Sequence, residues 1–280
     1  MLFDPTKLTG AHAEKVAELI RFDPLFQKLP TQLFTFDNGK TPKGEKQGYL
    51  TAIMYLAPSD LSGYPMCPFA KLAQCEKPCL NTAGRGKFDN VQKARIRKTL
   101  MFQQHRGKFD ALLIKEMHRA QRKADKMGLT LVVRLNGTSD IPWEIEPLLF
   151  VKVPLPPSSD YEYELQGLTI FECFSNVQFY DYTKYPTRHK LPANYHLTFS
   201  YSGARTFTPI TNKWHSKRTT QNIAVVFESK HNRDFLPWYV HIDGDESDLR
   251  FLDPINSVVS LTPKGNAKND TTGFVVRPGA

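Results

Sequence analysis

The chain has 280 residues, of which 40% are hydrophobic and 23% are charged, so it can bury a substantial core; this composition excludes long disorder and a fibrous repeat. Its 37 Lys and Arg residues outnumber its 28 Asp and Glu residues, which gives a formal charge of +9. All of that excess lies in residues 84–126, where 13 basic residues accompany 4 acidic ones. The positive charge is therefore local, and the rest of the chain is neutral.

The sequence contains no recognisable membrane span or export signal. No apolar run approaches the roughly 18 residues that a span needs. The N-terminus, MLFDPTKLTG, lacks the basic-then-apolar pattern of a signal peptide. We therefore expect a cytoplasmic protein with no membrane partner. In that compartment, cysteines that lie close together are metal ligands more often than disulfide partners.

Helical periodicity comes first along the chain. Residues 11–28 predict an amphipathic helix that stops at Pro24, and residues 88–104 and 108–127 predict two longer helices. A further helix is expected at residues 163–174. Short apolar runs predict strands at residues 49–56, 129–135, 177–180, 196–199, 223–227, 238–242 and 257–261.

The apolar runs predict the fold class, because several of them are followed directly by polar turns. Buried strands of this kind are typical of a parallel sheet in an α/β protein. We expect a partial (β/α) barrel of about six to seven mainly parallel strands. Residues 1–48 would form an N-terminal helical extension, and residues 49–280 a single barrel-like domain with a cysteine loop at 57–86. Ligands of such folds bind at the carboxyl ends of the strands, so the polar turns should line one mouth.

Three of the four cysteines, Cys67, Cys75 and Cys79, fall in the loop after the first strand with the spacing C-x7-C-x3-C. Three thiolates can bind an iron–sulfur cluster or Zn²⁺. Cys173 or His105 could supply a fourth ligand, although Cys173 fits a core position better. Without a fourth protein ligand, a cubane cluster keeps one iron open for a small molecule. Free surface thiols and a structural metal knuckle are the alternatives.

A strand, a three-cysteine loop and then alternating β/α units resemble the radical S-adenosylmethionine enzymes, whose usual spacing is C-x3-C-x2-C. The resemblance implies that Cys67, Cys75 and Cys79 ligate a 4Fe–4S cluster, and that S-adenosylmethionine binds its open iron. It also implies cofactor contacts from the residues after the second strand, namely Asn136, Gly137, Ser139 and Asp140. Residues at later strand ends, namely Asp181, Ser200 and Asp243, would supply contacts to the cofactor ribose and the substrate.

Four longer phrases, CPFAKLAQCEKPCLNTAGRG, FYDYTK, LTFSYSG and IDGDESDLRFLDP, resemble the gene product 88-like family of phage-encoded proteins. The similarity runs from about Asn38 to the C-terminus. It implies a phage protein that acts in the host cytoplasm, and it implies iron–sulfur ligation. It does not imply a particular reaction.

The basic segment predicts a polyanion-binding surface. Lys115, Arg119, Arg122 and Lys126 recur on one face of the helix expected at 108–127, and Arg85 lies next to the cysteines. Lys and Arg clustered on one face are typical of phosphate-binding surfaces. A nucleic acid or nucleotide is therefore the expected partner. A solvated helix face explains the same pattern equally well.

The remaining motifs assign no catalytic residue. The acidic segment 243–253 fails the EF-hand pattern, because position 6 from Asp243 is Asp248 and not glycine. Asp140 and Glu144 fit acid–base roles or loop hydrogen bonding equally well. The favoured hypothesis is a phage-encoded, radical-SAM-like iron–sulfur protein that acts on a nucleotide or nucleic acid. The alternative is a non-catalytic iron–sulfur or zinc protein that binds host nucleic acid or a host protein.

Overall fold

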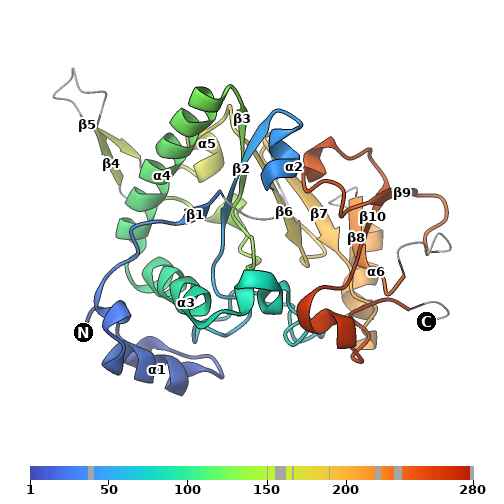
Figure 1. Cartoon of the computed structure of the whole chain (residues 1–280), viewed down its shortest axis with the longest axis horizontal. Coiled ribbons are helices and arrows are strands. Elements are labelled where there is room, and N and C mark those ends of the chain that lie inside the picture. The colour runs from blue at the N-terminus through green and yellow to red at the C-terminus, as the bar shows by residue number, and fades with distance from the viewer. Residues whose placement is uncertain are drawn as a thin grey trace.

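The computed structural model describes residues 1–36, 41–149, 151–154, 162–165, 167–188, 190–217, 222–229 and 235–277. In these residues an eight-stranded sheet forms the centre of the molecule, with the order β1-β2-β3-β6-β7-β8-β10-β9 (Figure 1). Its strands are β1 (Phe34–Thr35), β2 (Tyr49–Met54), β3 (Thr130–Arg134), β6 (Gln178–Thr183), β7 (Tyr195–Ser200), β8 (Asn222–Val226), β9 (Val240–Asp243) and β10 (Ser257–Leu261).

The sheet is mainly parallel, as the sequence predicted. Every neighbouring pair from β2 to β9 is parallel, and only the short β1 pairs with β2 in the antiparallel sense. Each of the expected apolar runs overlaps one of these strands. The predicted partial barrel is not confirmed, because β1 and β9 remain at two open edges of the sheet. The described strands therefore form an open α/β sheet.

The helices are α1 (Ala13–Phe22), α2 (Thr41–Glu45), α3 (Asp89–Gln104), α4 (Arg106–Met127), α5 (Ile170–Cys173) and α6 (Thr208–Lys217). The two long helices, α3 and α4, were predicted almost to the residue. Helix α1 is shorter than expected because Asp23 accepts a hydrogen bond from Leu25 N–H and starts a separate 3₁₀ turn at Pro24. Among the described helices, none combines the length and apolar character that a membrane crossing requires.

The prediction of a helix at residues 163–174 is largely wrong. Strand β5 (Glu162–Leu165) occupies its beginning and pairs with β4 (Val151–Pro154) in a separate antiparallel ribbon. Only α5 is helical, and Thr169 starts it with a capping box to Glu172. The apolar spacing of this stretch fits a helix, but the stretch forms a strand followed by a single helical turn.

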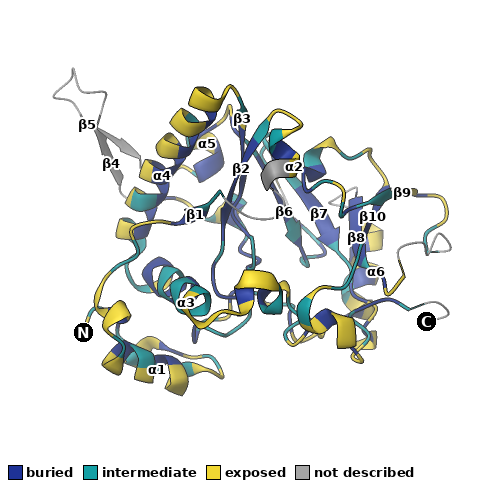
Figure 2. Cartoon of the chain, in the orientation of Figure 1, coloured by how far each residue is buried: buried dark blue, intermediate teal, exposed yellow. Residues whose placement is uncertain are grey.

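Helices α4 and α6 pack on one face of the sheet. Met117 and Ala120 of α4 belong to the same core cluster as Leu131 and Val133 of β3. At the other end, Trp214 of α6 stacks on Phe199 of β7 with ring centroids 4.8 Å apart. Figure 2 shows buried strands flanked by helices whose outer sides are exposed. The N-terminal segment joins this core through buried side chains that include Phe3, Val16, Ile20 and Phe26.

The opposite face of the sheet is more polar, because side chains alternate along each strand. Arg134 lies on that face, buried, with its Nη1 2.7 Å from Oδ2 of Asp248. Phe251 covers the same face and packs on Tyr49 and Tyr180. Arg134, at the end of β3 on this face, also lines the cavity described below.

The turn after β3 packs directly on β2 at Gly137. Its N–H donates to the carbonyl of Met54 at 2.9 Å. A Cβ atom at this position would lie 2.7 Å from that same carbonyl oxygen and 2.8 Å from Cγ2 of Ile53. Real Cβ atoms do not approach so closely, so only glycine fits here.

Gly137→Ala should therefore lower the free energy of unfolding by about 1–3 kcal/mol, the usual cost of overpacking. Gly107→Ala, in the first turn of α4, is the matched control. A Cβ there meets nothing within 4 Å, so alanine should stabilise the helix by about 0.5–1 kcal/mol. Urea denaturation measures both effects. A Gly137→Ala variant as stable as the unmodified protein would contradict the described packing.

Candidate functional site

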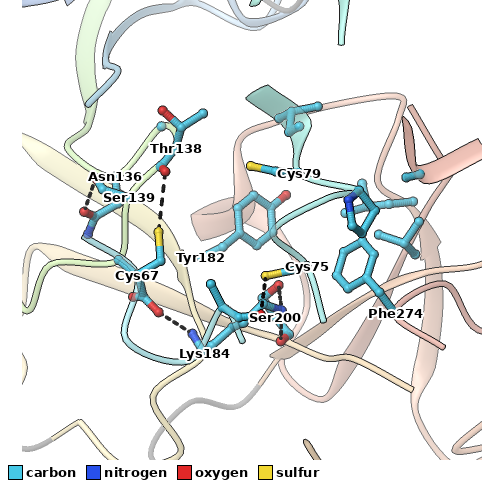
Figure 3. A pocket seen from close by; sticks show the side chains of 18 of the residues that line it. Cys67, Cys75, Cys79, Asn136, Thr138, Ser139, Tyr182, Lys184, Ser200 and Phe274 are labelled. Carbon is cyan, nitrogen blue, oxygen red and sulfur yellow. Dashed lines mark hydrogen bonds between the residues drawn. The ribbon is translucent and has the colours of Figure 1, made fainter. Parts of the chain in front are cut away.

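A cavity of about 290 Å³ lies at the carboxyl ends of the parallel strands. Residues of the cysteine loop form one wall, and residues that end or follow β3, β6, β7, β8 and β10 form the others. The cavity brings together eight of the residues that the sequence nominated for metal and cofactor binding (Figure 3). They are Cys67, Cys75, Cys79, Asn136, Gly137, Ser139, Asp140 and Ser200.

The three cysteine sulfurs are held by the backbone around them. Cys67 Sγ lies 3.6 Å from the carbonyl oxygen of Thr138, and Cys75 Sγ lies 3.7 Å from that of Ala70. Cys79 Sγ accepts from Asn81 N–H at 3.5 Å. Burial raises the pKa of each thiol, in the case of Cys79 to about 11, so the free thiols are neutral at pH 7.

The candidate fourth ligands lie elsewhere. Cys173 is in α5, where it packs against the main core, and burial raises the pKa of its thiol to about 11. His105 ends α3 with its Nε2 2.8 Å from the carbonyl oxygen of Leu2. Neither residue lines the cavity. Within the described residues, no three His, Cys, Asp or Glu side chains converge closely enough to hold a single metal ion.

The cysteine loop is fastened to parts of the chain far away in sequence. Hydrogen bonds connect it to the region after β7 and to the segment near the C-terminus. These bonds join Ser202 Oγ to Ala73 O (2.7 Å), Thr206 Oγ1 to Leu72 O (2.6 Å), Asn266 N to Thr82 Oγ1 (3.1 Å) and Thr272 Oγ1 to Gln74 O (3.3 Å). The loop is thereby fixed over the strand ends.

Asn136 shapes the turn after β3. Its Oδ1 accepts from Ser139 Oγ at 2.9 Å, from Ile141 N–H at 3.0 Å and from Trp143 Nε1–H at 3.3 Å. Its Nδ2 donates to the Ile141 carbonyl at 2.9 Å. Most of the hydrogen-bonding capacity of Asn136 is therefore used within the turn, and so is that of Ser139. Direct cofactor contacts from these two side chains remain a prediction.

Asp181 lies beneath the same turn and is completely buried. Its carboxylate accepts from the N–H groups of Leu135 (3.3 Å) and Asn136 (3.0 Å) and from the hydroxyl of Tyr195 (3.1 Å). Burial raises the pKa of Asp181 to about 7, against the opposing effects of Arg134 and of these hydrogen bonds. The resemblance implied ribose or substrate contacts from Asp181, but the structure makes it a buried anchor that does not line the cavity.

Asp140 follows the turn and faces the cavity. Its Oδ2 accepts from Lys184 N–H at 2.7 Å, and its Oδ1 lies 3.6 Å from Nη1 of Arg188. Oδ1 is buried and has no hydrogen-bond partner in the described structure. Burial raises the pKa of Asp140, while Arg188 opposes the shift. Glu144, the other candidate acid or base, pairs with Arg188 at 2.5 Å.

Lys184 is the main cavity residue that sequence reasoning missed. Its ammonium donates to the carbonyl oxygen of Ser200 at 2.9 Å and to its Oγ at 3.1 Å. The rings of Phe207 and Phe274 lie 5.3 and 5.2 Å away. Burial lowers the pKa of Lys184, and the cysteines and Asp140 oppose the shift. Lys184 directly follows β6. The expectation that polar residues after strands line the ligand site could therefore have identified it.

The acidic segment contributes Asp245 and not the expected Asp243. Asp243 ends the edge strand β9 and accepts from the N–H of Asp245 at 2.8 Å, and it is not among the residues that line the cavity. Asp245 lines it, paired with Lys264 at 2.6 Å. Burial raises the pKa of Asp245, but hydrogen bonds from Lys264 and Thr262 outweigh burial and bring it to about 2.

The basic stripe is not part of the cavity. Its four residues, Lys115, Arg119, Arg122 and Lys126, are exposed on α4. Helix α4 ends just before β3 begins, so this half of the helix lies near the start of the strands, away from their carboxyl ends (Figure 1). Arg85 is exposed in a 3₁₀ turn within the cysteine loop. Only Arg85 of the nominated basic residues is therefore near the site.

A family model for gene product 88 matches residues 32–278. The chain belongs to the gene product 88 family. The match confirms the resemblance carried by the sequence phrases, and with it the phage-encoded family. No curated protein and no solved structure matches the chain. The resemblance to radical S-adenosylmethionine enzymes thus has no support from these matches and stays a prediction.

Asp181→Asn should change how stability depends on pH. A carboxyl group whose pKa rises on folding, here from 3.8 to about 7, stabilises the fold most below pH 3.8 and loses that contribution as the pH rises through 7. The loss is at most about 1.4 kcal/mol per pH unit. Relative to the unmodified protein, the variant should therefore show a flatter decline in unfolding free energy over this range.

Asp245→Asn provides the control for the pH measurement. The pKa of Asp245 is lowered to about 2, so its contribution is present above pH 3.8 and is lost at lower pH. This variant should leave the slope between pH 3.8 and 7 unchanged. Equal slopes for Asp181→Asn and the unmodified protein would show that Asp181 is not the titrating anchor.

Proposed function

We propose that this member of the gene product 88 family binds a 4Fe–4S cluster through Cys67, Cys75 and Cys79. The observation that carries the proposal is that all three cysteines line one cavity at the carboxyl ends of the parallel strands. Parallel α/β folds place their ligand sites at this end of the sheet. No histidine or fourth cysteine of the described residues lines the cavity, which matches a cluster with one open iron.

The donor set suits a cluster better than a zinc ion. Zinc draws its thiolates to about 2.3 Å from one centre and takes four ligands in a closed site. The described residues contain no group so closely drawn together. In a cubane cluster each thiolate binds a different iron atom, so three sulfurs can surround a larger body. Three thiols spread around one cavity meet that requirement.

The cavity beside the cysteines has features that suit S-adenosylmethionine. Phe69, Tyr182 and Phe274 offer aromatic surface for an adenine ring. Oδ1 of Asp140 has no hydrogen-bond partner among the described residues, although it lies 3.6 Å from Nη1 of Arg188, so it can accept a hydrogen bond from an amine. Ser200 supplies a hydroxyl. When bound and reduced, the cluster supplies one electron for cleavage of the cofactor. In this proposal Asp140 positions the amino group of S-adenosylmethionine.

The substrate class is proposed as a nucleotide or nucleic acid. Arg85 supports it, because this exposed cation lies in the cysteine loop. The stripe on α4 gives no support for binding at the cavity, since it lies toward the other end of the sheet. A polyanion on α4 would bind independently of the cavity.

Anaerobic reconstitution with iron and sulfide tests the cluster. The unmodified protein should bind about four iron atoms per chain and give a brown solution with an electron-resonance signal after reduction. Ser substitutions at Cys67, Cys75 or Cys79 should each abolish or strongly reduce iron retention. Cys173→Ser is the matched control, because Cys173 lies outside the cavity, and it should retain full iron. A protein that takes up zinc but no iron would overturn the proposal.

Cofactor turnover tests the second half of the proposal. With dithionite as reductant, the reconstituted protein should cleave S-adenosylmethionine to methionine and 5′-deoxyadenosine. Asp140→Asn should weaken S-adenosylmethionine binding about tenfold or more while the iron content stays unchanged, because it removes a charge-assisted hydrogen bond worth roughly 1.5–3 kcal/mol. A cluster that forms without binding S-adenosylmethionine would instead support the alternative, a non-catalytic iron–sulfur protein.

A further inference from the structure

Among the described residues, no carboxylate pairs directly with the ammonium of Lys184 in the cavity, although the nearby Asp140 opposes the lowering of the Lys184 pKa. Within the described part of the chain, its ammonium donates to the carbonyl and hydroxyl of Ser200, which are neutral. No carboxylate of the described residues forms an ion pair with it; Asp140 instead receives the backbone N–H of Lys184. Lys184 lines the same cavity as Cys67 and Cys75 (Figure 3).

A second lysine of the same cavity provides the contrast. Lys264 pairs with Asp245 at 2.6 Å, and 43% of its side chain is exposed. Its charge is thus compensated within the protein and by water. The ammonium of Lys184 instead lies 5.3 Å and 5.2 Å from the ring centroids of Phe207 and Phe274. A charge withdrawn from water in this way is costly unless an opposite charge compensates it.

The bound cluster has the matching charge. Three thiolates outweigh the positive charge of a cubane core, so the cluster is anionic, and reduction adds one more negative charge. Lys184 lines the same cavity as the three cysteines. The cysteines, like Asp140, oppose the lowering of its pKa. A nearby fixed cation favours the more negative oxidation state and thereby raises the reduction potential.

We propose that Lys184 is the counter-ion of the cluster held by Cys67, Cys75 and Cys79, and that its charge stabilises the bound cluster, most strongly in the reduced state. The inference rests on the proposed function. Lys184 acts through its charge on the cluster, and a neutral side chain of similar shape would not replace it.

The test compares four variants in the full chain, before and after reconstitution with iron and sulfide. Lys184→Met and Lys184→Gln remove the charge, and the amide of glutamine keeps a donor for Ser200. Lys184→Arg keeps the charge, and Lys264→Met is the control from the same cavity. The readouts are the rise in melting temperature on cluster loading and the midpoint potential of the cluster.

Both neutral variants should show a smaller rise in melting temperature on loading than the unmodified protein. Their reduction equilibrium should become at least about tenfold less favourable, which corresponds to 59 mV for one electron. Lys184→Arg should retain most of both properties, and Lys264→Met should change neither. Because the rise on loading compares each variant with its own cluster-free form, a purely structural effect of the substitution cancels.

Two results would overturn the inference while the proposed function stands. One is an unchanged potential and loading response in both neutral variants, which would make Lys184 a structural residue. The other is an equal effect of Lys264→Met, which would make the effect a property of the net charge of the cavity. If the unmodified protein itself takes up no iron, the proposed function and this inference both fail.

Discussion

The buried carboxyl group of Asp181 connects three neighbouring strands, β3, β6 and β7, near the cavity. It receives two backbone N–H groups from the end of β3 and the hydroxyl of Tyr195 from β7. With the carboxylate in place, the turn that follows β3 starts at a fixed point. Gly137 then packs on β2, and the carbonyl oxygen of the next residue, Thr138, meets Cys67 Sγ. One buried carboxyl group is thus connected, through the turn after β3, to the first cysteine of the site.

Much of the fold and part of the site could be predicted from local pattern alone. Strands β2, β3 and β10 are nearly uniformly buried, and that burial appears directly as apolar runs. Polar residues at strand ends reach a common cavity because parallel strands end at the same edge. The same rule fails by two residues at Asp243, where β9 is an edge strand and its turn brings Asp245 to the cavity instead.

Other features depend on contacts that no local pattern encodes. Closure of a sheet requires pairing between its first and last strands, and here β1 and β9 remain separate edges. The ribbon of β4 and β5 arises from cross-strand pairing in a stretch whose apolar spacing also fits a helix. In the sequence, the basic residues of 84–126 suggest one continuous positively charged surface. In the fold, Arg95 is buried over Tyr55, Arg106 pairs with Asp110, and the α4 stripe is remote from the cavity.

The fastening of the cysteine loop has a consequence for the order of events during synthesis. Residues 72–82 receive hydrogen bonds from Thr206, Asn266 and Thr272, which leave the ribosome long after the cysteines do. Until then the loop lacks these contacts, while the strands and helices on its N-terminal side can already form. The cysteine loop therefore acquires all of these contacts only after the C-terminal segment has been synthesised. Completion of the site is one of the last steps in the maturation of the chain.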